Sequence, residues 1–266
     1  KKYFQIISGF SCLIIIAIFI IFSDYLSSPF SMNLSNRLSL IFSDNHLLGT
    51  DQFGRDLFAR IVRGSQASIT IGLLSSTIAI VIGTCMGLLS GYHGKYIDLL
   101  IMRTIDIIQG FPALLILIAL SLLLPPHNIT TICIIGFVSW TGIARLIRAE
   151  MIVIKTQDYI IAAQSFGYST SRTIIKHILP NCFASIIILY TLNIGNAIMY
   201  EASLAFLGMG ILPPEPSLGR MINEGKDFLR IAPHISIYPG IALSIIVLGF
   251  NLIGEGLRDA SDVRFK

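Results

Sequence analysis

The chain has 266 residues, of which 54% are hydrophobic and only 13% are charged. Soluble domains carry roughly 25% charged residues, so the composition excludes a globule covered by solvated side chains and predicts that lipid surrounds much of the chain. The net charge is +4 and there is no run of basic residues, which excludes a typical nucleic-acid-binding surface.

Six stretches are apolar and long enough to cross a bilayer, since a helical span needs about 20 residues for roughly 30 Å of hydrocarbon. They are Ile6 to Phe22, Ser68 to Gly91, Thr104 to Leu124, Ile129 to Ala144, Phe183 to Leu207 and Tyr238 to Gly256. Because a helix satisfies its own backbone in lipid, the predicted fold class is all-α, a polytopic membrane protein with about six transmembrane helices.

The first span follows two lysines and has no small-residue cleavage site after it, so we expect it to be retained rather than removed as a signal peptide. The sequence does not begin with Met, and we expect a few residues to precede Lys1.

The placement of Lys and Arg predicts the direction of the spans. With a cytoplasmic N-terminus, twelve of these residues fall in inner segments and seven in outer segments. The inner ones are Lys1, Lys2, Lys95, Arg103, Arg145, Arg148, Lys155, Arg172, Lys176, Arg258, Arg264 and Lys266, and the outer ones are Arg37, Arg55, Arg60, Arg63, Arg220, Lys226 and Arg230. Both termini are therefore predicted to be cytoplasmic.

The segment before the second span has an amphipathic pattern of its own. Its apolar face holds Phe53, Leu57, Phe58, Ile61 and Val62, and its polar face holds Arg55, Asp56, Arg60 and Arg63. This pattern predicts a short helix that lies in the headgroup plane or packs on a neighbouring subunit. We accordingly divide the chain into residues 1–67, the first transmembrane helix plus an outer segment with this interfacial helix, and residues 68–266, a five-helix core with a cytoplasmic loop at 150–182.

The second span carries small residues at every fourth position, which places them on one face of a helix. They are Ser75, Ala79, Gly83, Gly87 and Gly91. Such a stripe lets two helices approach closely. The helix that packs against this stripe belongs either to this chain or to a partner permease subunit.

No metal site is predicted. The four cysteines (Cys12, Cys85, Cys133 and Cys182) are far apart and form no CxxC pair, so we expect them to pack as small apolar residues. The outer histidines His46, His127 and His234 have no partner at i+4 and are interpreted as surface residues.

The loop between the fourth and fifth spans has a pattern that a mere connector does not need. A short helix through Tyr159 and Phe166 is expected to stop at Gly167, which supplies a left-handed cap. Ser169 can then cap a second helix from Thr170 to Leu179, ending at Pro180. A basic pair of helices that meet at a Gly suits either docking of a cytoplasmic protein or a turn that rests on the membrane.

The stretch from Tyr159 to Ser169, followed by Arg172 and His177-Ile178-Leu179-Pro180-Asn181, resembles the EAA loop of ABC importer permeases. In that family the loop forms a coupling helix that sits in a groove of the ATPase subunit. The residues that the resemblance assigns to this coupling are Tyr159, Ala162, Ala163, Gly167, Ser169, Arg172 and Pro180.

Two positions depart from the family pattern: Ile161 replaces its leading Glu, and His177 replaces a later Ile. Both departures resemble the peptide and nickel branch of the family. Further matches to that branch lie at Leu48–Asp56, Gly91-Tyr92, Asp98, Met102-Arg103, Asp106, Pro112, Glu201-Ala202, Phe206–Gly208, Pro213–Ser217 and Asn251–Asp259. Leu218 stands where the branch usually has Trp.

The resemblance implies a type I importer permease fold and a subunit that is not an enzyme. The sequence has no G-x-x-x-x-G-K-[ST] motif, so ATP and Mg are expected in partner chains and no cofactor in this one. The implied partners are a second homologous permease, two ATPase subunits, an extracytoplasmic substrate-binding protein and the bilayer, with no nucleic acid. The implied cargo is nickel, free or chelated, or an oligopeptide, and the short N-terminal tail leans towards nickel. An ion-coupled secondary transporter is the alternative, but it predicts an internal repeat, and none is found.

Three polar residues of the fifth span are candidates for the translocation path. Glu201 is the most informative, because a carboxylate in hydrocarbon costs several kcal/mol unless it is paired or wetted. It lines the path or an outer gate, or alternatively holds the packing of the outer loop. Asn193 and Asn196 are candidates for the same path, although cross-linking of helices is the favoured interpretation. Asp106 is expected to pair with Arg103 or Arg145.

Overall fold

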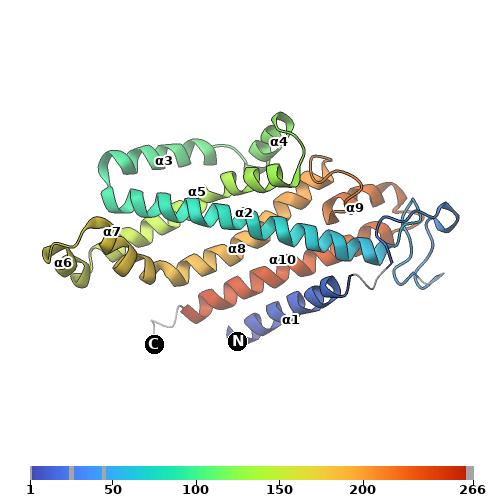
Figure 1. Cartoon of the computed structure of the whole chain (residues 1–266), viewed down its shortest axis with the longest axis horizontal. Helices are drawn as coiled ribbons and strands as arrows, with labels where there is room; N and C mark the ends of the chain where they lie inside the picture. Colours follow the sequence, from blue (N-terminus) through green and yellow to red (C-terminus); the bar gives the residue numbers. More distant parts are fainter. Residues whose placement is uncertain (1, 24–26, 44–45, 262–266) are drawn as a thin grey trace.

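The structure is a computed structural model that describes residues 2–23, 27–43 and 46–261 (Figure 1). Lys1, Arg264 and Lys266, which the charge analysis counts on the inner side, lie outside the described residues. Helices make up nearly all of the described chain, and the extended pairing within it consists of two isolated bridges. The elements are α1 (Lys2–Ile21), η2 (Leu34–Asn36), α2 (Leu57–His93), α3 (Lys95–Gln109), α4 (Ala113–Leu123), α5 (Asn128–Lys155), α6 (Asp158–Ser165), α7 (Thr170–Thr173), η3 (Ile174–Ile178), α8 (Leu179–Phe206), α9 (Leu218–Gly225), η4 (Lys226–Phe228) and α10 (His234–Ser261). The all-α prediction is confirmed.

Five helical runs in the described chain are long and apolar enough to cross a membrane, and a bent helix pair provides a sixth. The third predicted span, Thr104 to Leu124, lies within this pair, and the helix is broken there rather than continuous. Its halves α3 and α4 meet at 86°. Pro112 disfavours helical conformation at Phe111, so α3 stops at Gln109 and α4 starts after the proline.

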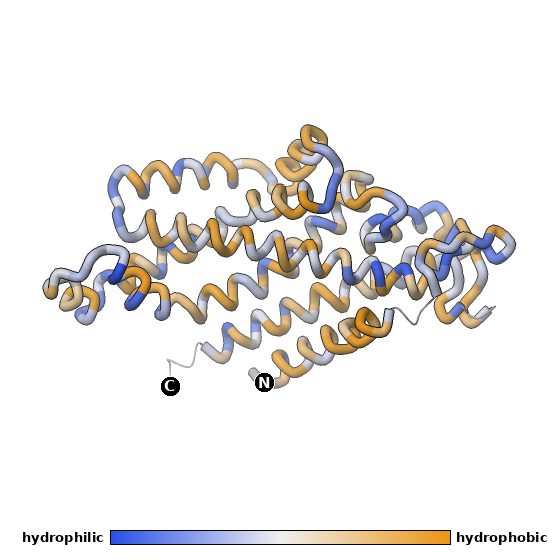
Figure 2. The backbone as a smooth tube through the Cα atoms, viewed as in Figure 1, coloured by the Kyte–Doolittle hydropathy of each residue, from blue (hydrophilic) through white to orange (hydrophobic). Residues whose placement is uncertain are grey.

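The long helices run side by side and place different segments at the two ends of the bundle (Figure 1). The pair α6–α7 lies at one end, and α10 ends on the same side of the molecule. The segment 27–56 and α9 lie towards the other. Figure 2 shows hydrophilic residues gathered towards these ends and hydrophobic residues along the helices between them, as a bilayer environment requires.

The small-residue stripe of α2 packs against α5 of the same chain, which decides between the two partners left open by the sequence. A Cβ at Gly83 would lie 2.7 Å from the Ile143 side chain, and one at Gly87 would lie 2.7 Å from the Ala144 carbonyl oxygen. Ala79 in the same stripe is fully buried. The backbones of α2 and α5 can approach this closely only because the side chains between them are small.

The predicted interfacial helix at residues 55–63 does not form a separate element. α2 begins at Leu57, where the Asp56 carboxylate accepts a hydrogen bond from the Ala59 N–H at 2.8 Å, and continues unbroken to His93. The division between residues 67 and 68 therefore falls inside a helix. At 1.5 Å per residue this helix is about 55 Å long, which is well beyond the roughly 30 Å thickness of the hydrocarbon.

The cysteines fit the packing prediction only in part. Cys182 is buried, whereas Cys85 and Cys133 are exposed on the surface of this single chain.

Candidate functional site

The helix α6 is held on the bundle by one face and exposes the other. Ile160 is fully buried and packs in a cluster with Met151, Ile178 and Cys182. Ala163 is 6% exposed, so the expectation that both alanines face a partner is wrong for Ala163, which is covered by its own chain. This inward face positions α6 rigidly relative to the spans.

The outward face of α6 is apolar. Tyr159 and Ile161 are about half exposed, Ala162 is exposed, and Phe166 is 82% exposed. An aromatic side chain that no described residue covers, at the hydrophilic end of a membrane bundle, marks a surface suited to a protein partner.

Gly167 reverses the chain after α6 in the conformation that the sequence predicts. Its φ is +76°, and a Cβ there would meet no atom within 4 Å, so backbone conformation rather than lack of space favours glycine. The Tyr168 N–H donates to the Ala163 carbonyl at 3.2 Å. This bond closes the helix end in a Schellman arrangement.

Ser169 caps α7, as predicted: its Oγ accepts from the Arg172 N–H at 3.4 Å. The Arg172 guanidinium lies over the Tyr168 ring at 4.2 Å, and the His177 ring stacks on the same tyrosine at 5.8 Å. His177, one of the two departures from the family pattern, therefore contributes to the shape of the bend.

The prediction that the second loop helix ends at Pro180 is wrong. A π-helical segment, Ile174–Ile178, leads directly into α8, and the Leu179 N–H bonds to the Ile174 carbonyl. Pro180 lies in the first turn of α8, and because it has no N–H it cannot donate a hydrogen bond back to the π-helical segment. The bent pair is thus continuous with a membrane span.

A cavity of about 500 Å³ lies where the α3–α4 break faces α5 and α8. Asn193 and Asn196, two of the predicted path residues, both line it. Asn193 also donates a hydrogen bond to Ser76 Oγ on α2 at 3.1 Å, so it both cross-links helices and faces the cavity. Gln109, Ser139, Thr141 and Tyr200 complete the polar lining, and sequence analysis singled out none of them.

Glu201 lies one residue beyond Tyr200 but points elsewhere. Its side chain is fully buried and its Oε2 accepts a hydrogen bond from Ser68 Oγ at 2.7 Å. This contact joins α8 to α2, and Glu201 is not among the residues that line the cavity.

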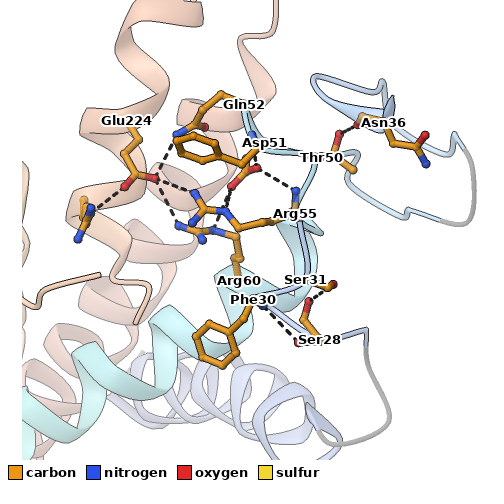
Figure 3. Close-up of polar contacts among 12 residues, drawn as sticks. Ser28, Phe30, Ser31, Asn36, Thr50, Asp51, Gln52, Arg55, Arg60 and Glu224 are labelled. Atoms are coloured by element: carbon orange, nitrogen blue, oxygen red, sulfur yellow. Dashed lines mark hydrogen bonds and ion pairs between the residues drawn. The ribbon is translucent and has the colours of Figure 1, made fainter. Parts of the chain in front are cut away.

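The opposite end of the molecule holds a charge cluster that sequence analysis missed (Figure 3). Asp51 accepts from Arg55 Nε at 2.6 Å, and Glu224 accepts from Arg220 Nε at 2.7 Å. Arg60, 2% exposed, lies between the two carboxylates, 3.4 Å from Asp51 and 3.3 Å from Glu224. Three guanidinium groups and two carboxylates thus join the outer segment to α9.

Arg55 and Arg60 were expected on the polar face of a helix in the headgroup plane or against a neighbouring subunit, but both are buried and pair with Glu224 of α9 in the same chain. The pairing was hidden because Arg60 and Glu224 are 164 positions apart. One sequence signal could have indicated this cluster. Arg220 and Glu224 are four residues apart, as in an ion pair on one helix face, and the predicted topology puts them on the same side of the membrane as Asp51.

The outer histidines differ from one another. His46 pairs with Asp56 at 2.6 Å, and His127 accepts from the Ile129 N–H. His234 is buried at 6% exposure, so its interpretation as a surface residue is wrong. Asp106 accepts from Arg145 at 2.8 Å, which confirms the predicted pair.

Comparison with known proteins places the chain among transport permeases. Residues 83–266 match the family model described as binding-protein-dependent transport system inner membrane component. The chain is 42% identical over 259 residues to the dipeptide transport system permease protein DppC of Alkalihalophilus pseudofirmus, covering 96% of this chain and 85% of the relative. It is 37% identical over 268 residues to the glutathione transport system permease protein GsiD of Pectobacterium atrosepticum, covering 100% and 89%.

A solved structure shows a similar fold. The MetNI methionine ABC transporter in inward-facing conformations aligns with a TM-score of 0.59 and 19% identity, covering 76% of this chain and 95% of the matched chain. The type I importer permease fold is confirmed, and none of these relatives is an ion-coupled secondary transporter. The chain therefore belongs to the family of binding-protein-dependent transport system inner membrane components, as a non-catalytic, multi-span permease subunit.

Proposed function

We propose that this chain is a permease subunit of an ATP-driven importer for short peptides of dipeptide or glutathione size. The chain aligns with at least 85% of the length of two relatives whose names carry dipeptide and glutathione transport. Peptide cargo is therefore favoured over nickel, towards which the N-terminal tail had leaned.

The observation that carries the ATP-driven mechanism is the exposed apolar face of α6, with Phe166 at its tip. α6 packs on the bundle through Ile160 and is followed by a π-helical segment that is continuous with α8. A movement of α6 can therefore be transmitted to a membrane span. Closure of an ATPase pair would move α6, and α8 would transmit that movement to the membrane region.

The proposed assembly contains a second homologous permease, two ATPase subunits and a substrate-binding protein outside the membrane. The termini and α6 are assigned to the cytoplasm. A single cysteine placed at Phe166 in a cysteine-free chain should react with an impermeant maleimide in inverted vesicles and not in intact cells. Labelling in intact cells would contradict this direction.

Uptake measurements test the cargo. A strain that lacks the transporter, supplied with the complete complex, should accumulate labelled dialanine and glutathione in an ATP-dependent manner, whereas labelled nickel ions should not accumulate. A strain supplied with the complex without this chain is the control. Nickel uptake without peptide uptake would overturn the proposal.

A further inference from the structure

The cavity at the α3–α4 break has the size and composition of a small-molecule site. Its volume of about 500 Å³ lies within the range of roughly 300–1,000 Å³ that is usual for such sites. Apolar residues of α4, α5 and α8, such as Ile116, Val138 and Leu192, form most of the wall. The break in the third span creates the space, because α4 turns away from the line of α3.

The polar groups of the cavity are amides and hydroxyls. They belong to Gln109, Ser139, Thr141, Asn193, Asn196 and Tyr200. Within the described chain, the residues that line the cavity are all uncharged. Such side chains both donate and accept hydrogen bonds, which matches a ligand that presents N–H and C=O groups together.

Part of this hydrogen-bonding capacity is unused. Gln109 donates to Thr141 Oγ1 at 3.2 Å, which holds both side chains at the mouth of the break. Ser139 Oγ is buried and has no hydrogen-bond partner in the described part of the chain. The Asn196 side chain, one turn before Tyr200 on the same face of α8, is exposed and bonds to no described residue. A buried polar atom is normally satisfied, so the unpartnered Ser139 Oγ points to a ligand, and the exposed Asn196 amide is free to bind the same ligand.

We propose that this cavity is the chain's own binding surface for the backbone of a peptide in transit, with the neutral side chains contacting peptide-bond amides and the apolar wall accepting side chains. This inference depends on the proposed function as a peptide importer, and it names the residues that contact the peptide. Peptide-bond amides occur in every peptide, so a site of this kind accepts many sequences and discriminates by length.

Gly142 provides a direct way to fill the cavity. It lines the cavity, and a Cβ there would meet no atom of this chain within 4 Å. In Gly142→Leu the new side chain therefore enters the cavity without a clash at its Cβ. Gly240 on α10 is the matched control, since it is also helical, meets no atom within 4 Å and does not line this cavity.

The experiment measures uptake of labelled dialanine and labelled trialanine by cells that carry the complete complex. Gly142→Leu should lower trialanine uptake at least about tenfold relative to dialanine uptake, whereas Gly240→Leu should leave the ratio unchanged. An unchanged ratio in Gly142→Leu, with normal assembly and wild-type uptake of both peptides, overturns the cavity proposal. If the wild type takes up neither peptide, the proposed function itself fails.

Gly142→Leu would fail to assemble if the partner permease fills the space near Gly142, so a second variant tests the cavity without adding volume. Thr141→Val keeps the shape of the side chain and removes only the hydroxyl that accepts from Gln109. In complexes that still contain the ATPase subunits, it should lower uptake of both peptides about three- to tenfold. Wild-type uptake by Thr141→Val would overturn the proposal even if Gly142→Leu does not assemble.

Discussion

Ser68 of α2 and Glu201 of α8 are joined by a hydrogen bond of 2.7 Å, and both side chains are fully buried. The two residues are 133 positions apart. The contact ties two spans together away from the cavity, which favours a packing role for Glu201 over a gate.

Glu201→Gln should therefore retain most of the transport activity, because the amide preserves the size of the side chain and can still accept from Ser68. Glu201→Leu should lower the thermal stability of the purified complex, since it leaves the Ser68 hydroxyl buried without its partner at a cost of about 1–3 kcal/mol. Both variants are compared by peptide uptake and by melting temperature in detergent. If Glu201→Gln loses uptake at normal stability, Glu201 has a role in the translocation path or its gate rather than in packing.

Gly167→Arg should abolish uptake and association with the ATPase subunits while membrane insertion stays normal. The residue lies at φ +76°, where a side chain adds backbone strain of about 1–3 kcal/mol, and a long charged group projects from the bend. The measurement is co-purification of the ATPase with the tagged permease.

Gly208→Arg is the matched control for this change. Gly208 has φ +82°, equally open surroundings and a position after α8, so it carries the same strain away from α6. If the two variants retain equal amounts of ATPase, the docking assignment is incorrect.

Phe166→Ser should weaken ATPase association without lowering the stability of the permease, because the ring is 82% exposed and makes few internal contacts. Ile160→Ser on the buried face of the same helix should instead destabilise the chain by about 2–5 kcal/mol through loss of packing. Melting temperature and co-purification, measured together, separate the two faces. Normal ATPase binding by Phe166→Ser would argue against this face as the partner surface.

Glu224→Gln should destabilise the end of the molecule that carries segment 27–56. Removing this carboxylate leaves Arg60, 2% exposed, with Asp51 alone, and an uncompensated buried charge costs about 3–5 kcal/mol. The outer segment should then be cleaved faster by added protease. Glu215→Gln is the control, since its pair with Arg63 is more than 40% exposed on both sides and should change stability by less than about 1 kcal/mol.

Several features of the turn between α6 and α7 were predictable from the sequence because local conformation determines them. Gly167 favours a positive φ, Ser169 favours a helix N-cap, and both act within a few residues of chain. The face that α6 exposes was predicted less well. Ala162 and Ala163 are adjacent and alike, and only the packing of Ile160 against α5 and α8 decided that Ala163 turns inwards.

The low charge content and the length of the apolar stretches by themselves determined that this protein is an all-helical membrane bundle, because the requirement to satisfy the backbone in lipid leaves few other folds. Tertiary structure alone decided the 86° angle between α3 and α4, the cavity beside their junction and the burial of Arg60. The physical reason is distance along the chain. Partners such as Arg60 and Glu224 are 164 residues apart, and no local pattern records which charges or cavities the folded helices bring together.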